Sequence, residues 1–154
     1  MVAARVYTKG RMTRALSSET LHATSVAIDG RAVLLAGVSG IGKSDLALRL
    51  MDRGALLVSD DYTLVQRIDG GLIATAPATI AGRMEVRGIG IVDMPHAKEA
   101  PVALIVDLFD TVDRMPMQPL YRTIAGLPVR VAKVAPLEAS APIKVELALR
   151  GIDL

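Results

Sequence analysis

A phosphate-binding pattern, G-x-x-x-x-G-K-[ST], constrains the fold of this chain most strongly, and it reads Gly37-Val38-Ser39-Gly40-Ile41-Gly42-Lys43-Ser44. Its glycines let successive backbone N–H groups point into one concave surface, Lys43 adds a cation, and the Ser44 hydroxyl is a ligand for Mg²⁺. Residues 32–36 predict a short buried strand before the loop, and residues 44–53 predict a helix that Gly54 ends. An anion would lie at the helix N-terminus, where the dipole favours negative charge.

Composition limits the class of protein. With 154 residues the chain is long enough for one domain with a proper core, and because 51% of it is apolar with one Phe, three Tyr and no Trp, that core is aliphatic. The apolar runs are too short to span a bilayer, so we expect no membrane segment. The absence of cysteine excludes disulfides, thiolate metal sites and cysteine nucleophiles, and it fits the reducing cytoplasm.

The positive charge lies at the N-terminus. Residues 1–20 hold Arg5, Lys9, Arg11 and Arg14 against Glu19, a net charge of +3, whereas the whole chain carries +2. The rest of the chain is therefore slightly acidic, and Tyr7 is the single aromatic residue among the basic ones, which is too few for a stacking surface. We predict a solvated basic tail at 1–20, a single domain at 21–154, and no nucleic-acid partner.

Strand and turn signals alternate along the chain. Asp29-Gly30 predicts a hairpin between strands at 22–28 and 31–36, and Asp69-Gly70-Gly71 predicts another between 63–68 and 72–76. Further strands are expected at 55–59, 88–93, 102–109 and 129–134, with an irregular proline-broken connection at 111–128 and a closing helix at 139–149. Hairpins beside a strand–loop–helix unit predict an α/β fold whose sheet is mixed and flanked by helices.

Phosphoryl transfer also needs acids, which hold Mg²⁺ and accept a proton. Three apolar runs end in Asp, at Asp60-Asp61, Asp93 and Asp107. We favour Asp60 and Asp61, because adjacent like charges repel unless a metal or cation offsets them, and we interpret Asp93 and Asp107 as ordinary strand-end or turn aspartates. Residues 82–90 place Glu85 between two arginines and among glycines, which alone indicates an exposed charged loop. His22 alone would indicate a core histidine in an apolar strand.

Taken together, these residues resemble the catalytic domain of HPr kinase/phosphorylase. The resemblance rests on residues 37–44, the Asp60-Asp61 pair, the run at 85–91 and His22, and it covers residues 20 to 115 best. This bacterial family phosphorylates a serine of HPr, the phosphocarrier of the sugar phosphotransferase system, and can reverse the reaction. The resemblance implies a phosphoenolpyruvate carboxykinase-like nucleotide-binding fold, ATP and Mg²⁺ as cofactors, an HPr-like partner and a hexameric homo-oligomer.

The resemblance also implies a role for each matching position. Residues 37–44 would hold the nucleotide phosphates, with Lys43 stabilising the transferring charge. Mg²⁺ would be held by Ser44 and Glu85, with Asp60 at the same metal. Asp61 would exchange the proton of the acceptor serine, His22 would lie close to Asp61 and tune its charge, and Arg114 would match the family's catalytic arginine.

Three departures from the family pattern stand out. Only about 20 residues precede the match, whereas the usual form carries an N-terminal domain; such a short form resembles those of alphaproteobacteria. Asp45 stands where the family usually has Glu. The family's later Pro-Gly-Arg-Asn loop, used in dephosphorylation, has no counterpart after Arg130, so we expect weak or absent phosphorylase activity. Two alternatives stay open: a nucleotide-dependent sensor that transfers no phosphate, and a small-molecule kinase, which the lack of an arginine-rich lid disfavours.

Overall fold

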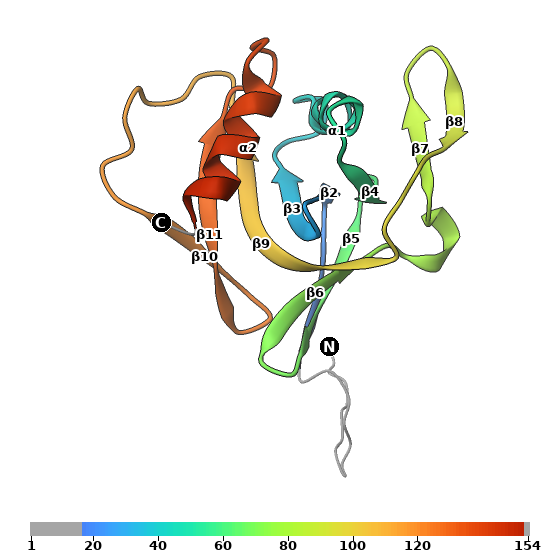
Figure 1. The fold of residues 1–154 in the computed structure, drawn as a ribbon, viewed down its shortest axis with the longest axis horizontal. Helices are drawn as coiled ribbons and strands as arrows, with labels where there is room; N and C mark the ends of the chain where they lie inside the picture. The colour runs from blue at the N-terminus through green and yellow to red at the C-terminus, as the bar shows by residue number, and fades with distance from the viewer. Residues whose placement is uncertain (1–16, 153–154) are drawn as a thin grey trace.

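The computed structural model describes residues 17–152, which fold around a strongly curved mixed sheet with two α-helices on one side (Figure 1). The elements in chain order are β1 (Ser18–Leu21), β2 (Ala23–Ile28), β3 (Arg31–Ala36), α1 (Lys43–Asp52), β4 (Leu56–Ser59), β5 (Thr63–Ile68), β6 (Gly71–Thr75), the short 3₁₀ helix η1 (Ala78–Ile80), β7 (Arg83–Val86), β8 (Gly90–Asp93), β9 (Glu99–Leu108), β10 (Leu120–Ile124), β11 (Leu127–Val134) and α2 (Ala141–Gly151). Neither helix in this range is long and apolar enough to cross a membrane.

The long strand β9 joins the two halves of the sheet. Strands follow one another in the order β1-β5-β6-β9-β3-β2-β4, with β11 also paired to β9 and β10 paired to β11. The first residues of β9 pair antiparallel with β6, and its remainder pairs parallel with β3 and β11 as the strand bends (Figure 1). Parallel and antiparallel pairs therefore share one sheet, which agrees with the mixed sheet predicted from the sequence.

The two predicted hairpins form with left-handed turn residues. Asp29 and Gly30 have φ of 51° and 79°, and Asp69 and Gly70 have φ of 51° and 80°. Two central residues with positive φ give the turn whose twist matches that of the flanking strands. These local signals fixed the pairing of β2 with β3 and of β5 with β6.

Aliphatic side chains fill both faces of the central strands. Leu35 and Val106 pack with Leu46 of α1 and Leu149 of α2, whereas Leu34 and Ile105 on the same two strands pack in a second cluster on the opposite face. Neighbouring residues of a strand point to opposite faces, so strands covered on both faces are apolar throughout. The packing aligns the carboxyl ends of β3 and β9, where Ala36 lies beside Asp107 and the chain enters the glycine loop.

Residues 82–93 differ from the prediction of an exposed loop at 82–90 followed by a strand at 88–93. They form the β7–β8 hairpin, which stands beside α1 at one corner of the molecule (Figure 1). Its turn is possible because Gly88 has φ of 86°, and it is anchored because the Met84 side chain is only 1% exposed and packs in the core under the helices. The charged residues that suggested a loop occupy the outer side of this hairpin.

Two further expectations need correction. The connection expected at 111–128 is irregular only up to Pro119, because β10 and β11 pair across a turn in which Ala125 and Gly126 both have positive φ. At the other end, β1 begins at Ser18 and pairs with β5, so the tail boundary expected after residue 20 falls inside a strand. The four basic residues of that tail, at 5, 9, 11 and 14, lie outside the described residues. The closing helix runs from Ala141, with Pro142 in its first turn as expected.

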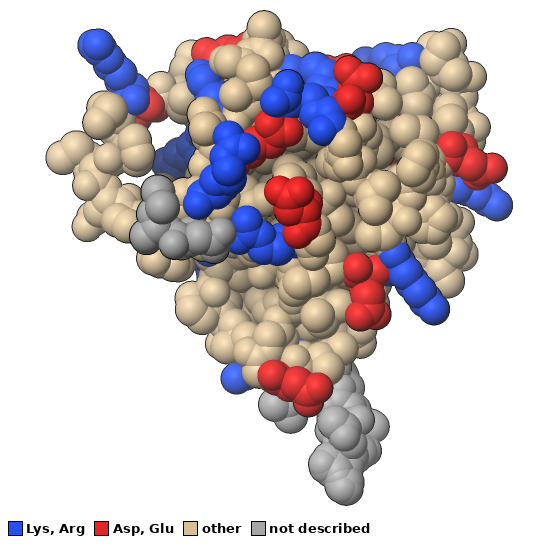
Figure 2. Space-filling model, in the orientation of Figure 1, with Lys and Arg blue, Asp and Glu red and all other residues tan. Residues whose placement is uncertain are grey.

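Charged side chains of both signs lie close together on the face drawn in Figure 2, mostly over the part that carries the helices. Several pair within or between helices: Arg49 with Asp45, Arg53 with Glu146, and Lys144 with Glu138 just before α2. Arg49 also donates to the backbone carbonyls of Pro136 and Glu138, so α1 is tied to the segment that leads into α2.

Candidate active site

The glycine loop turns sharply from β3 into α1 and leaves the start of that helix open. Gly40 and Gly42 have φ of 82° and 114°, a conformation that other residues rarely adopt. Gly42 is the N-cap of α1, and the helix has no side-chain cap there. The first backbone N–H groups of a helix have no partner inside it, so an uncapped start at a glycine loop is suited to an anion. The geometry agrees with a phosphate site.

Lys43 lies under this loop. Lys43 is only 7% exposed, and its Nζ donates hydrogen bonds to the carbonyl oxygens of Gly37 (2.8 Å) and Val38 (3.0 Å). A buried ammonium group requires acceptors, and these two carbonyls supply them. The same bonds hold the cation at the inner side of the loop, close to the place where phosphate oxygens would lie.

Asp60 connects three elements around the start of α1. Its Oδ1 accepts hydrogen bonds from Ser44 Oγ (2.7 Å) and Thr24 Oγ1 (3.2 Å), and its Oδ2 accepts one from the Glu85 backbone N–H (3.2 Å). The residue is 9% exposed. A carboxylate taken out of water needs such donors. Asp60 thus links the helix after the loop, strand β2 and the β7–β8 hairpin.

Asp61 faces the other way, although it is the next residue. Its φ is 71°, its side chain is 61% exposed, and its Oδ1 lies 3.0 Å from His22 Nε2. His22 stands between β1 and β2 and stacks on Tyr62 with ring centroids 5.0 Å apart. The histidine is therefore not the core residue that its apolar neighbours alone would indicate: 42% of its side chain is exposed. The structure brings His22 and Asp61 together at the surface.

Ser44 and the Glu85 backbone both contact Asp60, but the side chains of these three residues do not form a closed metal site. The Glu85 side chain is exposed and only its backbone N–H contacts Asp60. Among residues 17–152 no group of three or more His, Cys, Asp or Glu side chains could hold a metal. A hydroxyl with one or two carboxylates fits Mg²⁺, which keeps several waters and completes its shell with substrate phosphates.

Three predicted or considered residues lie apart from this cluster. Arg114 is exposed in the connection between β9 and β10, and it makes no hydrogen bond or ion pair with any described residue. Asp93 lies at the end of β8 with 95% of its side chain exposed. Asp107, inside β9, accepts two hydrogen bonds from Arg122 (2.7 and 2.8 Å). The interpretation of Asp93 as an ordinary strand-end residue agrees with its position. Asp107 instead forms an ion pair in which both of its oxygens accept from Nη2 of Arg122.

Sequence reasoning missed Thr24, Tyr62 and Arg122. Thr24 contacts both acids, Tyr62 stacks on the histidine, and Arg122 binds Asp107. Only Thr24 left a signal, a hydroxyl residue inside a buried strand two positions after His22. The other two contacts depend on where distant strands meet.

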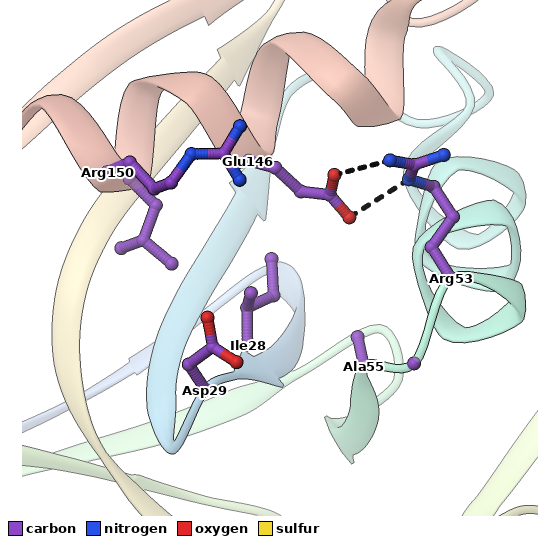
Figure 3. A pocket seen from close by; sticks show the side chains of 8 residues that line it. Ile28, Asp29, Arg53, Ala55, Glu146 and Arg150 are labelled. Carbon is purple, nitrogen blue, oxygen red and sulfur yellow. Dashed lines mark hydrogen bonds and ion pairs between the residues drawn. The ribbon is translucent and has the colours of Figure 1, made fainter.

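A separate pocket of about 360 Å³ lies at the other end of α1 (Figure 3). Its walls come from the β2–β3 turn, the end of α1 and the helix α2, and they are Ile28, Asp29, Arg53, Gly54, Ala55, Glu146, Leu149 and Arg150. Two hydrogen bonds join Arg53 to Glu146 across it (2.7 and 3.0 Å). The hydrogen bond and the charge of Arg53 lower the pKa of Glu146, and Glu146 raises that of Arg53. The pocket contains none of the residues around the glycine loop.

Residues 14–146 match the family model of the HPr Serine kinase C-terminal domain. This chain belongs to that family. HPr kinase/phosphorylase from Clostridium tetani is 36% identical over 128 residues, which cover 75% of this chain and 42% of the relative. The protein of the same name from Bordetella petrii is 34% identical over 155 residues, covering 87% of this chain and 50% of the relative. The chain thus spans about half the length of the curated relatives it matches.

A solved structure of this family shows the same fold. The Hpr(Ser) kinase/phosphatase from Coxiella burnetii matches with a TM-score of 0.74 and 32% sequence identity, over 86% of this chain and 89% of that one. The predicted fold class is confirmed: an α/β fold with a mixed sheet, of the phosphoenolpyruvate carboxykinase-like P-loop kind. On this scaffold the chain carries the glycine loop at 37–44, the Asp60-Asp61 pair and His22.

Proposed function

We propose that this protein is an ATP- and Mg²⁺-dependent protein serine kinase that phosphorylates an HPr-like phosphocarrier. One observation carries the proposal: two consecutive aspartates beside the glycine loop serve different partners. Asp60 points inward to Ser44, and Asp61 points outward to His22. A phosphoryl transfer site needs one carboxylate for the metal and one for the acceptor proton. The family membership and the named relatives support the same activity.

The inward half of the site would hold the nucleotide. The loop N–H groups and the start of α1 would bind the phosphates, and Lys43 would exchange its bonds to Gly37 and Val38 for bonds to phosphate oxygens. Ser44 and Asp60, with Glu85 beside them, would hold Mg²⁺, which when bound offsets the phosphate charge. Asp60 already orients the Ser44 hydroxyl at 2.7 Å.

The outward half would receive the acceptor serine. Asp61 would take the hydroxyl proton of that serine onto a carboxylate oxygen, while His22 orients the carboxylate through its Nε2. Because 61% of the Asp61 side chain is exposed, a serine presented on the surface of another protein can reach it. This exposure favours a protein acceptor over a small molecule that must be enclosed.

Labelled ATP, Mg²⁺ and a purified HPr-like protein test the proposal. We expect phosphoserine on the carrier, and none on a carrier whose acceptor serine is replaced by alanine. Transfer to a metabolite instead would indicate a small-molecule kinase. Nucleotide binding without transfer to either acceptor would indicate a sensor and would contradict the proposal.

A further inference from the structure

Four hydroxyl side chains lie fully buried beneath the Asp60-Asp61 turn. Thr24 and Ser25 come from β2, Ser59 from β4 and Thr63 from β5, and each residue is 0% exposed. Their neighbours in the core are aliphatic. A hydroxyl is retained in such surroundings only if it forms hydrogen bonds, because otherwise valine or alanine would be the more favourable residue there.

Three of these hydroxyls, those of Ser25, Ser59 and Thr63, form hydrogen bonds without contacting the side chain of Asp60 or Asp61. Ser25 Oγ and Thr63 Oγ1 lie 2.8 Å apart, and Thr63 Oγ1 also lies 2.8 Å from the Ala23 carbonyl oxygen. Ser59 donates to the Tyr62 carbonyl oxygen and so closes the turn. These bonds hold strands and backbone together.

Thr24 differs because both of its hydrogen bonds reach the acid pair. Its Oγ1 donates to Asp60 Oδ1 (3.2 Å) and accepts from the Asp61 backbone N–H (3.1 Å). A hydroxyl has one proton to donate and lone pairs to accept, so one side chain can hold both groups at once. Valine has the same shape and the same restricted χ1, but it can form neither bond.

We propose that Thr24 is a positioning residue that keeps the carboxylates of Asp60 and Asp61 pointing apart; the inference rests on the proposed kinase function. Asp61 has a φ of 71°, which is uncommon for a residue other than glycine and persists only where the surroundings hold it. The hydrogen bond from the Asp61 backbone N–H to Thr24 Oγ1 helps to hold this backbone conformation. Without it the backbone can relax to negative φ and carry the Asp61 carboxylate away from His22.

The same hydroxyl acts on the inward side. Asp60 Oδ1 is shared between Thr24 and Ser44, so the Thr24 bond fixes the carboxylate orientation that Ser44 meets at 2.7 Å. Thr24 therefore acts through the two aspartates and touches neither the nucleotide loop nor the surface, since it is fully buried. Its removal should alter the chemical step more than nucleotide binding.

The test compares Thr24→Val with Thr24→Ser in the full chain. Thr24→Val removes both hydrogen bonds, and we expect kcat for carrier phosphorylation to fall about tenfold or more, with KM for ATP changed less than about twofold. Thr24→Ser keeps Oγ, and we expect kcat within about threefold of the wild type. Thr63→Val is the matched control, because it removes buried hydroxyl bonds of the same kind that reach neither acid; its kcat should stay within about twofold.

A second measurement uses the nucleotide-free protein. Amide hydrogen exchange at Asp61 should be about tenfold faster or more in Thr24→Val than in the wild type, and unchanged in Thr63→Val, because among residues 17–152 it is Thr24 that accepts from that N–H. This readout does not depend on activity.

The outcomes separate the two ideas. A wild-type protein that transfers phosphate, with Thr24→Val equal to it in kcat and Asp61 exchange, overturns the role of Thr24 alone. Equal losses of kcat in Thr24→Val and Thr63→Val overturn it too, because the effect would then be general destabilisation. If Thr24→Val does not fold, the test rests on Thr24→Ser. A folded Thr24→Ser whose kcat falls about tenfold also overturns the role of Thr24, because the hydroxyl is still present in that variant. A wild-type protein that transfers nothing contradicts the proposed function, and with it the catalytic purpose of this contact.

Discussion

His22 Nε2 lies 3.0 Å from Asp61 Oδ1, although 39 residues separate them in the chain. The contact arises because β2 pairs with β4, which brings the start of β2 to the turn after β4. Tyr62 stacks on the histidine ring and limits its movement. The pair gives an exposed carboxylate a fixed partner, which is consistent with the general-base role proposed for Asp61.

Asp61→Asn should separate proton transfer from nucleotide binding. The substitution keeps the shape of the side chain but removes the proton acceptor, so we expect the rate of carrier phosphorylation to fall by a factor of about 10² to 10⁴. ATP affinity, measured by calorimetry, should change little. Asp93→Asn is the control, because that side chain is 95% exposed on the hairpin and should leave the rate near that of the wild type. Equal losses at both positions would show that the wrong carboxylate has been chosen.

Lys43→Ala should abolish phosphoryl transfer while the fold survives. Lys43 is the cation that hydrogen-bonds to the loop carbonyls, and alanine supplies no charge there, so we expect the rate to fall by a factor of about 10³. Circular dichroism would check the fold. Lys144→Ala removes a half-exposed lysine of α2 and should keep the rate within about twofold. A Lys43→Ala variant with a near-normal rate would refute the phosphate-loop assignment.

The features predicted well from the sequence are those set by short-range chemistry. The glycine loop and the two Asp-Gly hairpins depend on which residues tolerate positive φ, and that is written locally in the chain. The strand before the loop and the helix after it were predicted within a residue or two of β3 and α1. The association of Asp61 with His22 came from the family resemblance, not from spacing.

The features missed depend on contacts between distant segments. Met84 gave no local sign that it would enter the core and turn residues 82–93 into a hairpin. Arg122 reaches Asp107 only because β10 joins the sheet beside β11, and β11 pairs with β9. Thr24 is identified as a contact of both acids only when β2 and the turn after β4 are placed together. Periodicity cannot reveal such pairs.

The Arg53–Glu146 pair should make stability depend on pH. The hydrogen bond from Arg53 lowers the pKa of Glu146 below its ordinary value of 4.5 in the folded state (Figure 3). The pair therefore stabilises the fold above the unfolded-state pKa, and this contribution is lost as pH falls through the lower folded-state pKa. Glu146→Gln should lower the denaturation midpoint at about pH 7 and lower it less at about pH 3.

A control for this prediction is Glu138→Gln, which removes the partner of Lys144. Both side chains of that pair are about half exposed, so the midpoint should change little at either pH. The same midpoint shift for Glu146→Gln at both pH values would show that the ion pair is not its cause.

We expect the protein to form a homo-oligomer, a hexamer by family resemblance. The β7–β8 hairpin exposes Ile89 (76%) and Ile91 (67%), and the loop before β10 exposes Met117 (94%). The hairpin and this loop lie on opposite sides of the molecule (Figure 1), and exposed apolar side chains at two such places are suited to contacts with neighbouring chains. Light scattering should give a mass of several chains, and a stable monomer at working concentration would end this expectation.

The reverse reaction should be weak or absent. It requires inorganic phosphate to attack the phosphoserine, and therefore a second anion site with donors of its own. The resemblance implies that the family supplies these partly from an arginine-containing loop; at that place this chain has residues 131–136, in which the cation is Lys133. Lys133 lies over the Phe109 ring (5.6 Å to its centroid), and it lacks the bidentate fork of arginine.

Arg122, which lies on the neighbouring strand β10, does not replace the arginine of the family's later loop. Arg122 donates from one nitrogen, Nη2, to both carboxylate oxygens of Asp107, so this guanidinium is already held by a carboxylate. Purified phospho-carrier, Mg²⁺ and inorganic phosphate given to the enzyme should release pyrophosphate much more slowly than the forward reaction proceeds. Asp107→Asn would weaken the hold on Arg122, and we expect any residual reverse rate to rise. A wild-type reverse rate equal to the forward rate would show that the family's loop is dispensable for the second anion.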